Sequence, residues 1–361
     1  MMLTAANHGF MGQALELAGR GLYTTTPNPR VGCVIVRDGA VVGTGWHEKT
    51  GMPHAEVLAL KEARDRARGA TLYVNLEPCS HHGRTPPCVE AIIPAGIKRV
   101  VAAMQDPNPK VAGAGFSLLR AAGIAVEQGL MEGEARELNI GFVARMTRGR
   151  PWVRMKIAAS LDGRTALANG RSQWITGEPA RRDGHRWRAR ACAVLTGFGT
   201  VRDDDPRLNV RGVDTPRQPL KIVVDSKFET SPSARLLQEG KTLVVGAVND
   251  EKRIAALKAA GAEAVMIPND SGKVELFKLM EELARRELNE IHVEAGTKLN
   301  GSLLQAGVVD ELLVYLAPSV IGDSGRGMFS LPELTELSRS TALKIREVER
   351  VGEDLRILAR I

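Results

Sequence analysis

The sequence predicts two consecutive α/β domains. Apolar runs of strand length alternate with amphipathic helical patterns, and this alternation occurs twice along the 361 residues. Between the two series lies TRGRP (147–151), a segment with turn-forming residues and two arginines. We therefore expect a first domain over 1–146, a linker over 147–151 and a second domain over 152–361.

The first domain has the element order α-β-β-α-β-α-β-α-β-α, which is typical of a three-layer α/β sandwich. The turn Arg37-Asp38-Gly39 separates the first two strands, and Gly96 ends a helix. The expected elements are helix 8–19, strands 31–36 and 41–46, helix 55–64, strand 71–76, helix 87–96, strand 99–104, helix 115–122, strand 124–127 and helix 131–145.

The second domain repeats the α/β pattern without a recognisable phosphate loop. We expect strands over 152–160, 222–226, 242–247, 290–295 and 311–318, with helices between some of them. Neither G-x-G-x-x-G nor G-x-x-x-x-G-K-[ST] is present, because TGFGTV (195–200) lacks the third glycine. A dinucleotide in this domain would not bind as in an ordinary Rossmann fold.

The composition is that of a globular protein, with 43% hydrophobic and 25% charged residues. No apolar run reaches the roughly 18 residues of a membrane span, and no secretory signal pattern precedes the first domain. We therefore expect a cytoplasmic protein with reduced cysteines and no membrane partner. The net charge of +7 suits small phosphorylated ligands, whereas 4% aromatic residues and no basic block argue against nucleic acid.

The residue types of a catalytic zinc site occur in two nearby stretches. HAE (54–56) opens a predicted helix, and EPCSHHGRTPPC (77–88) follows a predicted strand. One imidazole, His54, and two thiolates, Cys79 and Cys88, hold Zn²⁺ with a fourth position open for water. Glu56, two residues after His54, can take a proton from that water and deliver it to a departing amine.

Zinc deaminases have the related pattern H-x-E followed by P-C-x-x-C. Here eight residues separate the cysteines instead of two, which lengthens the loop without removing a ligand. The inserted loop should face the substrate, where His81 could hydrogen-bond a base and Arg84 could pair with a phosphate. A rival interpretation is a structural Cys2His2 site that uses His81 or His82, but it leaves His54 and Glu56 unexplained.

The other two cysteines lie in apolar surroundings. Cys33 stands in VGCVIV and Cys192 in RACAVL, and we expect both to fill the core.

Together with TPNPRVGC (26–33), these motifs resemble the bacterial bifunctional riboflavin-biosynthesis family RibD, in which a pyrimidine deaminase is fused to a reductase. The resemblance covers nearly the whole chain. It implies a cytidine-deaminase-like first domain acting on 2,5-diamino-6-ribosylamino-4-pyrimidinone 5′-phosphate, with ammonia leaving. It implies zinc on His54, Cys79 and Cys88, with Glu56 as proton shuttle. The implied substrate contacts are Asn28, His47, His81 and Arg84.

Three stretches of the second domain resemble the reductase half of that family, namely 156–166, 195–211 and 294–305. The resemblance implies a fold like dihydrofolate reductase and NADPH-dependent reduction of the ribosyl group to ribityl. The implied cofactor contacts are Ala158, Trp174, Thr200, Asp204, Ser226, Gly296, Thr297, Lys298, Leu299, Asn300, Gly301 and Ser302. The implied substrate contacts are Ser172, Arg188, Leu208, Arg211 and Glu294. Asp204 is our hypothesis for the proton donor.

Two other functions remain open from the sequence. One is a tRNA adenosine deaminase with an appended RNA-binding domain, since HAE (54–56) fits both. The other is a deaminase whose second domain serves only in assembly. For the bifunctional enzyme we expect a homo-oligomer, a dimer or a tetramer. Our leading prediction has a phosphorylated pyrimidine as the partner and no nucleic acid.

Overall fold

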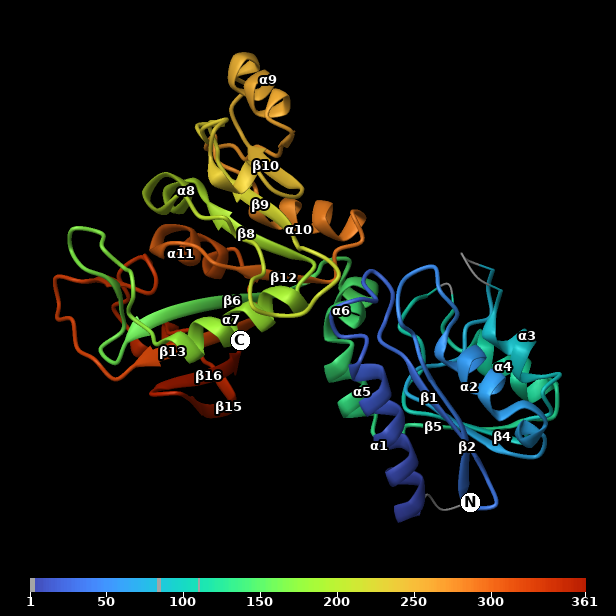
Figure 1. Ribbon diagram of the computed structural model, residues 1–361. Helices are drawn as coiled ribbons and strands as arrows, with labels where there is room; N and C mark the ends of the chain where they lie inside the picture. The colour runs from blue at the N-terminus through green and yellow to red at the C-terminus, as the bar shows by residue number, and fades with distance from the viewer. Residues whose placement is uncertain (1–3, 83–85, 110) are drawn as a thin grey trace. The chain divides into compact units, whose positions relative to one another are not determined.

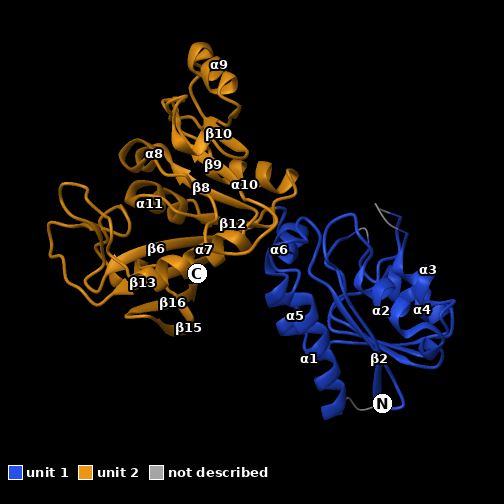
Figure 2. Cartoon of the chain, viewed as in Figure 1, with its two compact units in different colours: residues 1–149 blue, residues 150–361 orange. Residues whose placement is uncertain are grey.

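The computed structural model describes residues 4–82, 86–109 and 111–361. The chain divides into two compact units, Met1–Gly149 and Arg150–Ile361 (Figure 2). None of the described helices has the length and apolar character needed to cross a membrane.

The first unit is built on a five-stranded sheet with the order β2-β1-β3-β4-β5. β1 pairs antiparallel with β2 and β3, whereas β3, β4 and β5 run parallel. The strands are β1 (Gly32–Arg37), β2 (Ala40–Trp46), β3 (Thr71–Val74), β4 (Arg99–Ala102) and β5 (Ala125–Gln128). The helices are α1 (Ala5–Gly19), α2 (Ala55–Ala63), α3 (Cys88–Ile92), α4 (Ala114–Ala121), α5 (Glu132–Leu138) and α6 (Ile140–Arg148).

The strands of this sheet bury both faces. In β1, Cys33 and Ile35 pack into a core cluster with residues of α2, α3 and α4. Val34 and Val36 point the other way, into a cluster with residues of α1 and α5. This alternation follows from the two-residue period of a strand. Helices cover both faces of the sheet (Figure 1), so the predicted three-layer α/β arrangement is confirmed.

Two predicted helices of the first unit differ from the observed ones. The single helix expected over 131–145 is two helices, broken at Asn139. The Asn139 amide accepts from the Arg30 backbone N–H at 2.8 Å and donates to the Arg30 carbonyl at 2.9 Å, contacts that its own sequence neighbourhood does not reveal. The helix expected over 87–96 ends at Ile92. Ile93 still has helical backbone angles, but Pro94 has no N–H that could continue the hydrogen bonds of the helix.

Helix α2 lies unusually close to β2. A Cβ on Gly43 would come 2.3 Å from the Ala59 carbonyl oxygen, and one on Gly45 would come 2.3 Å from the Ala55 carbonyl oxygen. The helix presents Ala55, Ala59 and Ala63 to the sheet, so small residues meet on both sides. The backbone of the strand therefore fixes the position of the helix that begins after His54.

The second unit contains a nine-stranded sheet with the order β11-β10-β9-β8-β12-β6-β13-β16-β15. The strands from β11 to β13 run parallel, and the last two, β16 and β15, are antiparallel. The strands are β6 (Trp152–Ser160), β8 (Ala193–Gly197), β9 (Leu220–Val224), β10 (Thr242–Gly246), β11 (Glu263–Met266), β12 (Glu290–Val293), β13 (Glu311–Ala317), β15 (Lys344–Val351) and β16 (Asp354–Arg360). The helices are α7 (Glu178–Arg190), α8 (Phe198–Asp204), α9 (Glu251–Ala259), α10 (Leu276–Arg285) and α11 (Thr297–Gln305), and β7 (Arg164–Ala166) pairs with β14 (Arg326–Gly327).

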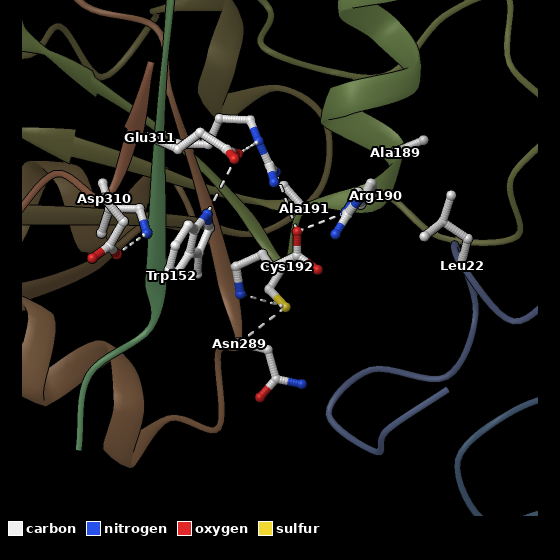
Figure 3. A network of polar contacts seen from close by, with 12 residues as sticks. Leu22, Trp152, Ala189, Arg190, Ala191, Cys192, Asn289, Asp310 and Glu311 are labelled. Atoms are coloured by element: carbon white, nitrogen blue, oxygen red, sulfur yellow. Dashed lines mark hydrogen bonds and ion pairs between the residues drawn. The ribbon is translucent and has the colours of Figure 1, made fainter. Parts of the chain in front are cut away.

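The face of this sheet toward α7 is rich in buried charge. Arg154 donates to Glu311 at 2.6 Å and to Glu290 at 3.2 Å, and all three side chains are almost completely buried. Figure 3 shows the surrounding network, including Arg190, which donates to Glu290 at 2.7 Å. Cys192 is buried as expected, and its sulfur accepts from the Asn289 backbone N–H at 3.2 Å.

Candidate metal centre and reductase site

Three elements of the first unit bring the predicted metal ligands together. His54 is the residue before α2, Cys79 lies in the loop after β3, and Cys88 is the first residue of α3. His54 Nδ1 lies 3.2 Å from Cys88 Sγ and 3.5 Å from Cys79 Sγ. The three ligand atoms all lie within 4.8 Å of one another.

The donor set fits a zinc ion, with one thiol that ionises readily and another, Cys88, whose pKa is raised by its hydrogen bond with Cys79 and by burial. Hydrogen bonds from Cys88 and His54 lower the pKa of the Cys79 thiol to about 4, despite its burial. One imidazole nitrogen and two sulfurs at this spacing are what a catalytic Zn²⁺ site with three protein ligands requires. His54, Cys79 and Cys88 are therefore the residues that would hold the ion.

Glu56 lies in the first turn of α2 and is buried beside these ligands. Its Oε2 is buried and accepts no hydrogen bond from the part of the chain that the structure describes. Burial, assisted by the negative charge of Cys79, raises the pKa of Glu56 to about 7. A carboxyl with this pKa can both take up and release a proton near neutral pH.

Asn28, in TPNPRVGC, and His47, directly after β2, lie beside the same centre. The Asn28 amide nitrogen lies 3.1 Å from His47 Nε2, and His47 Nδ1 lies 3.2 Å from the Pro53 carbonyl oxygen. The rings of His47 and His54 meet edge to face, with centroids 5.1 Å apart. Burial lowers the pKa of His47, which favours the neutral ring. This chain of contacts fixes the orientation of the Asn28 amide.

The loop histidines do not join the metal ligands. His81 and His82 are exposed, and His82 lies 3.9 Å from Glu90 across the surface. Neither belongs to the described group of metal-capable side chains, which favours the open zinc site over the Cys2His2 interpretation. Arg84 lies outside the described residues.

A buried carboxylate that the sequence did not indicate holds the loop with Cys79. Glu77 accepts hydrogen bonds from the backbone N–H groups of Asp106 (3.1 Å), Gly113 (3.0 Å) and Phe116 (3.2 Å). It thereby joins the start of the cysteine loop to the N-terminus of α4. The three amides are far away in the sequence, so only the apolar context of Glu77 could have hinted at this contact.

In the second unit, the positions expected at the cofactor follow the carboxyl ends of neighbouring strands. Thr200 lies in α8 directly after β8, Ser226 follows β9, and Gly296 follows β12. A Cβ on Gly296 would lie 3.8 Å from Thr200 Oγ1, and Ala158 is near the carboxyl end of the next strand, β6. Open α/β sheets bind ligands at this edge. The sheet thus brings these four positions to one place.

An ion pair forms the centre of the expected substrate contacts. Arg188 of α7 donates from Nε and Nη2 to the two carboxylate oxygens of Glu294, and from Nη1 to the Asn209 carbonyl at 2.9 Å. Burial alone would raise the pKa of Glu294, but the Arg188 guanidinium holds it well below its usual range. Leu208 precedes Asn209 and has a left-handed backbone (φ 53°). The Arg211 backbone N–H donates to His185 Nδ1 at 3.2 Å.

Other expected contacts lie in varied surroundings. Trp174 is 69% exposed, with the Arg181 guanidinium 4.7 Å from its ring, and Ser172 lies in the same loop. Asp204 is at the end of α8, where partial desolvation and the charge of Asp203 raise its pKa.

Gly296 is the residue before α11, and Thr297–Ser302 form most of that helix. Leu299 packs on the core, and Asn300 donates to the Met328 carbonyl at 3.3 Å. A Cβ on Gly301 would come 2.0 Å from the Ser330 carbonyl oxygen. The Ser302 hydroxyl donates to the Lys298 carbonyl at 3.0 Å. Contact between this helix and a cofactor therefore falls mainly to its first turn.

Two titratable residues beside this ion pair are not among the contacts predicted from the sequence. Lys156 on β6 and His292 on β12 are close enough to Arg188 and Glu294 to interact with them, and burial lowers the pKa of each. The sequence contains a pattern that could have indicated them. Every second residue of 154–156 and of 290–294 is charged or polar within an otherwise apolar strand, so these side chains share one face of the sheet.

Comparison with known proteins identifies the family of both units. The family description "RibD C-terminal domain" matches residues 151–357, and "Cytidine and deoxycytidylate deaminase zinc-binding region" matches residues 5–104. The riboflavin biosynthesis protein RibD of Escherichia coli K12 is 48% identical over 359 residues, which cover 96% of this chain and 97% of that protein. This chain belongs to the RibD family.

Solved RibD structures match over almost the full length. One from Acinetobacter baumannii has a TM-score of 0.92 at 42% identity and covers 98% of both chains. A Thermotoga maritima deaminase/reductase has a TM-score of 0.87 at 33% identity, again over 98% of both chains. As a RibD family member, the chain is a bifunctional deaminase and reductase of riboflavin biosynthesis, and its α/β fold class is confirmed.

Proposed function

We propose that the first unit deaminates 2,5-diamino-6-ribosylamino-4-pyrimidinone 5′-phosphate and that the second unit then reduces the ribosyl group with NADPH. The observation that carries the proposal is the buried Glu56 carboxyl beside the convergent His54, Cys79 and Cys88, with its Oε2 free of hydrogen bonds from the described residues. The family membership supports the order of the two steps and the class of substrate.

The first unit supplies acid–base chemistry and orientation. Zn²⁺ held by its three ligands would lower the pKa of a water molecule at the ring carbon that bears the amine. Glu56 receives the proton and returns it to the departing ammonia, as its pKa of about 7 allows. Asn28, fixed by His47, presents an amide that can donate to and accept from the pyrimidine edge.

The second unit supplies alignment and charge. NADPH would provide the hydride, and the loop before α11 offers first-turn N–H groups to its phosphates, with no acidic side chain in that turn. Arg211 and Arg188 place positive charge for the substrate phosphate beside Glu294. Asp204 remains our proton donor, and the Asp204→Asn variant should lose most of the reductase rate while it still binds NADPH. An unchanged rate would remove Asp204 from this role.

The decisive experiment follows NADPH consumption by the zinc-loaded full chain. With the diamino substrate, the wild type should consume NADPH and release ammonia, and Glu56→Gln should do neither. Glu56→Gln should consume NADPH when the deaminated compound is supplied, because the second unit is intact. No consumption with either compound would refute the reductase assignment, and ammonia release by Glu56→Gln at the wild-type rate would refute the role of Glu56.

A further inference from the structure

His185 on α7 is a half-buried titratable residue that the proposed chemistry does not use. Its Nδ1 accepts the backbone N–H of Arg211 at 3.2 Å. An imidazole nitrogen that accepts a hydrogen bond carries no proton, so the proton of the neutral ring is on Nε2. No described residue accepts a hydrogen bond from that Nε2. The contact therefore leaves one N–H donor of His185 for a ligand.

The helix that carries His185 is fixed on both sides of it. Two residues before, the buried Asp183 accepts from the Tyr315 hydroxyl at 2.6 Å. Three residues after, Arg188 donates to Glu294 at 2.8 Å. The imidazole therefore lies between two anchored points of the helix, which limits how far it can move.

The loop that supplies the other half of the contact is also held. The backbone N–H of Val210 donates to Gln218 Oε1 at 2.7 Å, and its carbonyl accepts from Gln218 Nε2 at 3.3 Å. The Asn209 carbonyl accepts from Arg188 at 2.9 Å. These contacts direct the next backbone N–H, that of Arg211, toward the imidazole, so the contact is formed before any ligand binds.

The charged groups around His185 are mostly positive. Arg188 of α7 and Arg211 of the loop after α8 act on it most strongly, and Lys156 of β6 adds to their effect. Glu294, after β12, is the opposing carboxylate, and it is already paired with Arg188. Neither Arg211 nor Lys156 forms an ion pair with a described residue. Burial and then the two arginines lower the pKa of His185 to about 4, and an anion would offset this positive charge.

We propose that His185 donates from Nε2 to the 5′-phosphate of the reductase substrate and gains a proton when that phosphate binds. The inference rests on the proposed reductase function, and it makes His185 a residue that selects phosphorylated substrates. A phosphate dianion accepts charge-assisted hydrogen bonds and offsets the cations that disfavour imidazolium. The substrate, rather than the cofactor, supplies this phosphate, because the groups around His185 include Arg188, Arg211 and Glu294, which are expected substrate contacts.

Isothermal titration calorimetry of the zinc-loaded full chain tests the donor. The ligands are the deaminated compound and the same compound without its phosphate. His185→Ala should weaken binding of the phosphorylated compound by about tenfold to a hundredfold, and it should leave binding of the other compound unchanged. His185→Gln should recover most of the lost affinity, because its amide can accept from Arg211 and still donate. A merely structural role would weaken the binding of both compounds.

The proton gain has its own measurement. His185 is neutral in the free protein above about pH 4, so a higher pKa in the complex means that binding takes up a proton. Titrations in two buffers of different ionisation enthalpy give the number of protons. At about pH 5.5 the wild type should take up more protons than His185→Gln, and at about pH 8 the two should agree. The ligand phosphate also titrates in this range, but its contribution is common to both proteins.

Arg182→Ala is the matched control on the same helix. Arg182 is exposed and pairs with Glu178, so its loss should change the affinity for either compound by less than about twofold. Circular dichroism checks that each variant is folded, and a titration with NADPH checks the cofactor site.

Several results would overturn the proposal. One is a His185→Ala variant that binds both compounds as the wild type does, or that loses affinity for both equally. Others are a loss confined to NADPH affinity, and equal proton uptake by the wild type and His185→Gln at about pH 5.5. A wild type that does not bind the deaminated compound would overturn this proposal and the reductase assignment together. A wild type that binds it, shows these differences and consumes no NADPH would refute the reductase assignment alone.

Discussion

Replacing Glu77 with glutamine should loosen the loop that carries Cys79. The two carboxylate oxygens of Glu77 accept three backbone hydrogen bonds, two of them on Oε2. A glutamine can place its single oxygen where Oε2 accepts from Asp106 and Gly113, but its NH2 group then points at the Phe116 N–H. One hydrogen bond is lost, two lose the benefit of a charged acceptor, and two donors face each other.

The magnitude follows from these contacts. A hydrogen bond to a charged group contributes about 1.5–3 kcal/mol, and one to a neutral group about half as much. We expect the free energy of local opening to fall by about 3 kcal/mol, which corresponds to a roughly hundredfold faster exchange of the protected amides. Because Glu77 precedes Cys79 by only two residues, zinc affinity should also fall, by about tenfold.

Hydrogen exchange of the peptides that span residues 104–118, followed by mass spectrometry, measures this effect directly. Glu90→Gln is the matched control, because Glu90 is exposed and accepts no backbone hydrogen bond from the described residues. Competition with a chromophoric chelator gives the zinc affinity. Equal exchange rates in Glu77→Gln and Glu90→Gln would show that the Glu77 carboxylate does not hold this loop.

Three further variants test the remaining framework. Gly45→Ala should lower the free energy of unfolding by about 1–3 kcal/mol and reduce the zinc content, because the added Cβ meets the backbone of α2. Gly12→Ala, where the added Cβ lies in open space, should leave the free energy of unfolding unchanged or raise it. Urea unfolding and metal analysis of the two variants measure these effects. Burial raises the pKa of Asp106 to about 6, above its usual 3.8, so the native state disfavours the charged carboxylate. Asp106→Asn should therefore raise the free energy of unfolding by up to about 3 kcal/mol at pH 7.5 and by about half of that at pH 5. A difference between variant and wild type that does not change with pH would contradict this. Arg154→Leu leaves two buried carboxylates without the guanidinium that they share, and it should destabilise the second unit by about 3–5 kcal/mol. Arg182→Leu removes one side of an exposed ion pair and should change the stability of the second unit by less than about 1 kcal/mol. Unfolding followed by tryptophan fluorescence measures both differences.

The metal centre could be predicted because its chemistry is local in the sequence. His54 and Glu56 are two residues apart at a helix start, and Cys79 and Cys88 flank one loop, so residue type and spacing were sufficient. Glu77 could not be predicted in the same way, since its three partners lie about 30 to 40 residues downstream and are backbone groups without a sequence signature.

In the second unit, even less of the candidate site could be predicted from residue type and spacing alone. Its strands were recognisable from apolar runs, but the residues that matter come from the ends of several strands that only the sheet order brings together. Periodicity predicts which residues share a face of one strand, as for Arg154 and Lys156, but not which strand lies beside it. Without the resemblance, Arg188 and Glu294 could not have been paired from the sequence.

The glycine–alanine contact between β2 and α2 has a consequence for how this enzyme can vary. The backbone of α2 lies directly against the backbone of β2 at these glycines, so the distance of His54 and Glu56 from the sheet is set by backbone contact. No change of side-chain rotamer can adjust it. Core substitutions elsewhere can repack without moving these two residues. The strand and helix therefore hold His54 and Glu56 at a fixed position. Attempts to change the substrate should leave Gly43, Gly45 and the alanines of α2 unsubstituted.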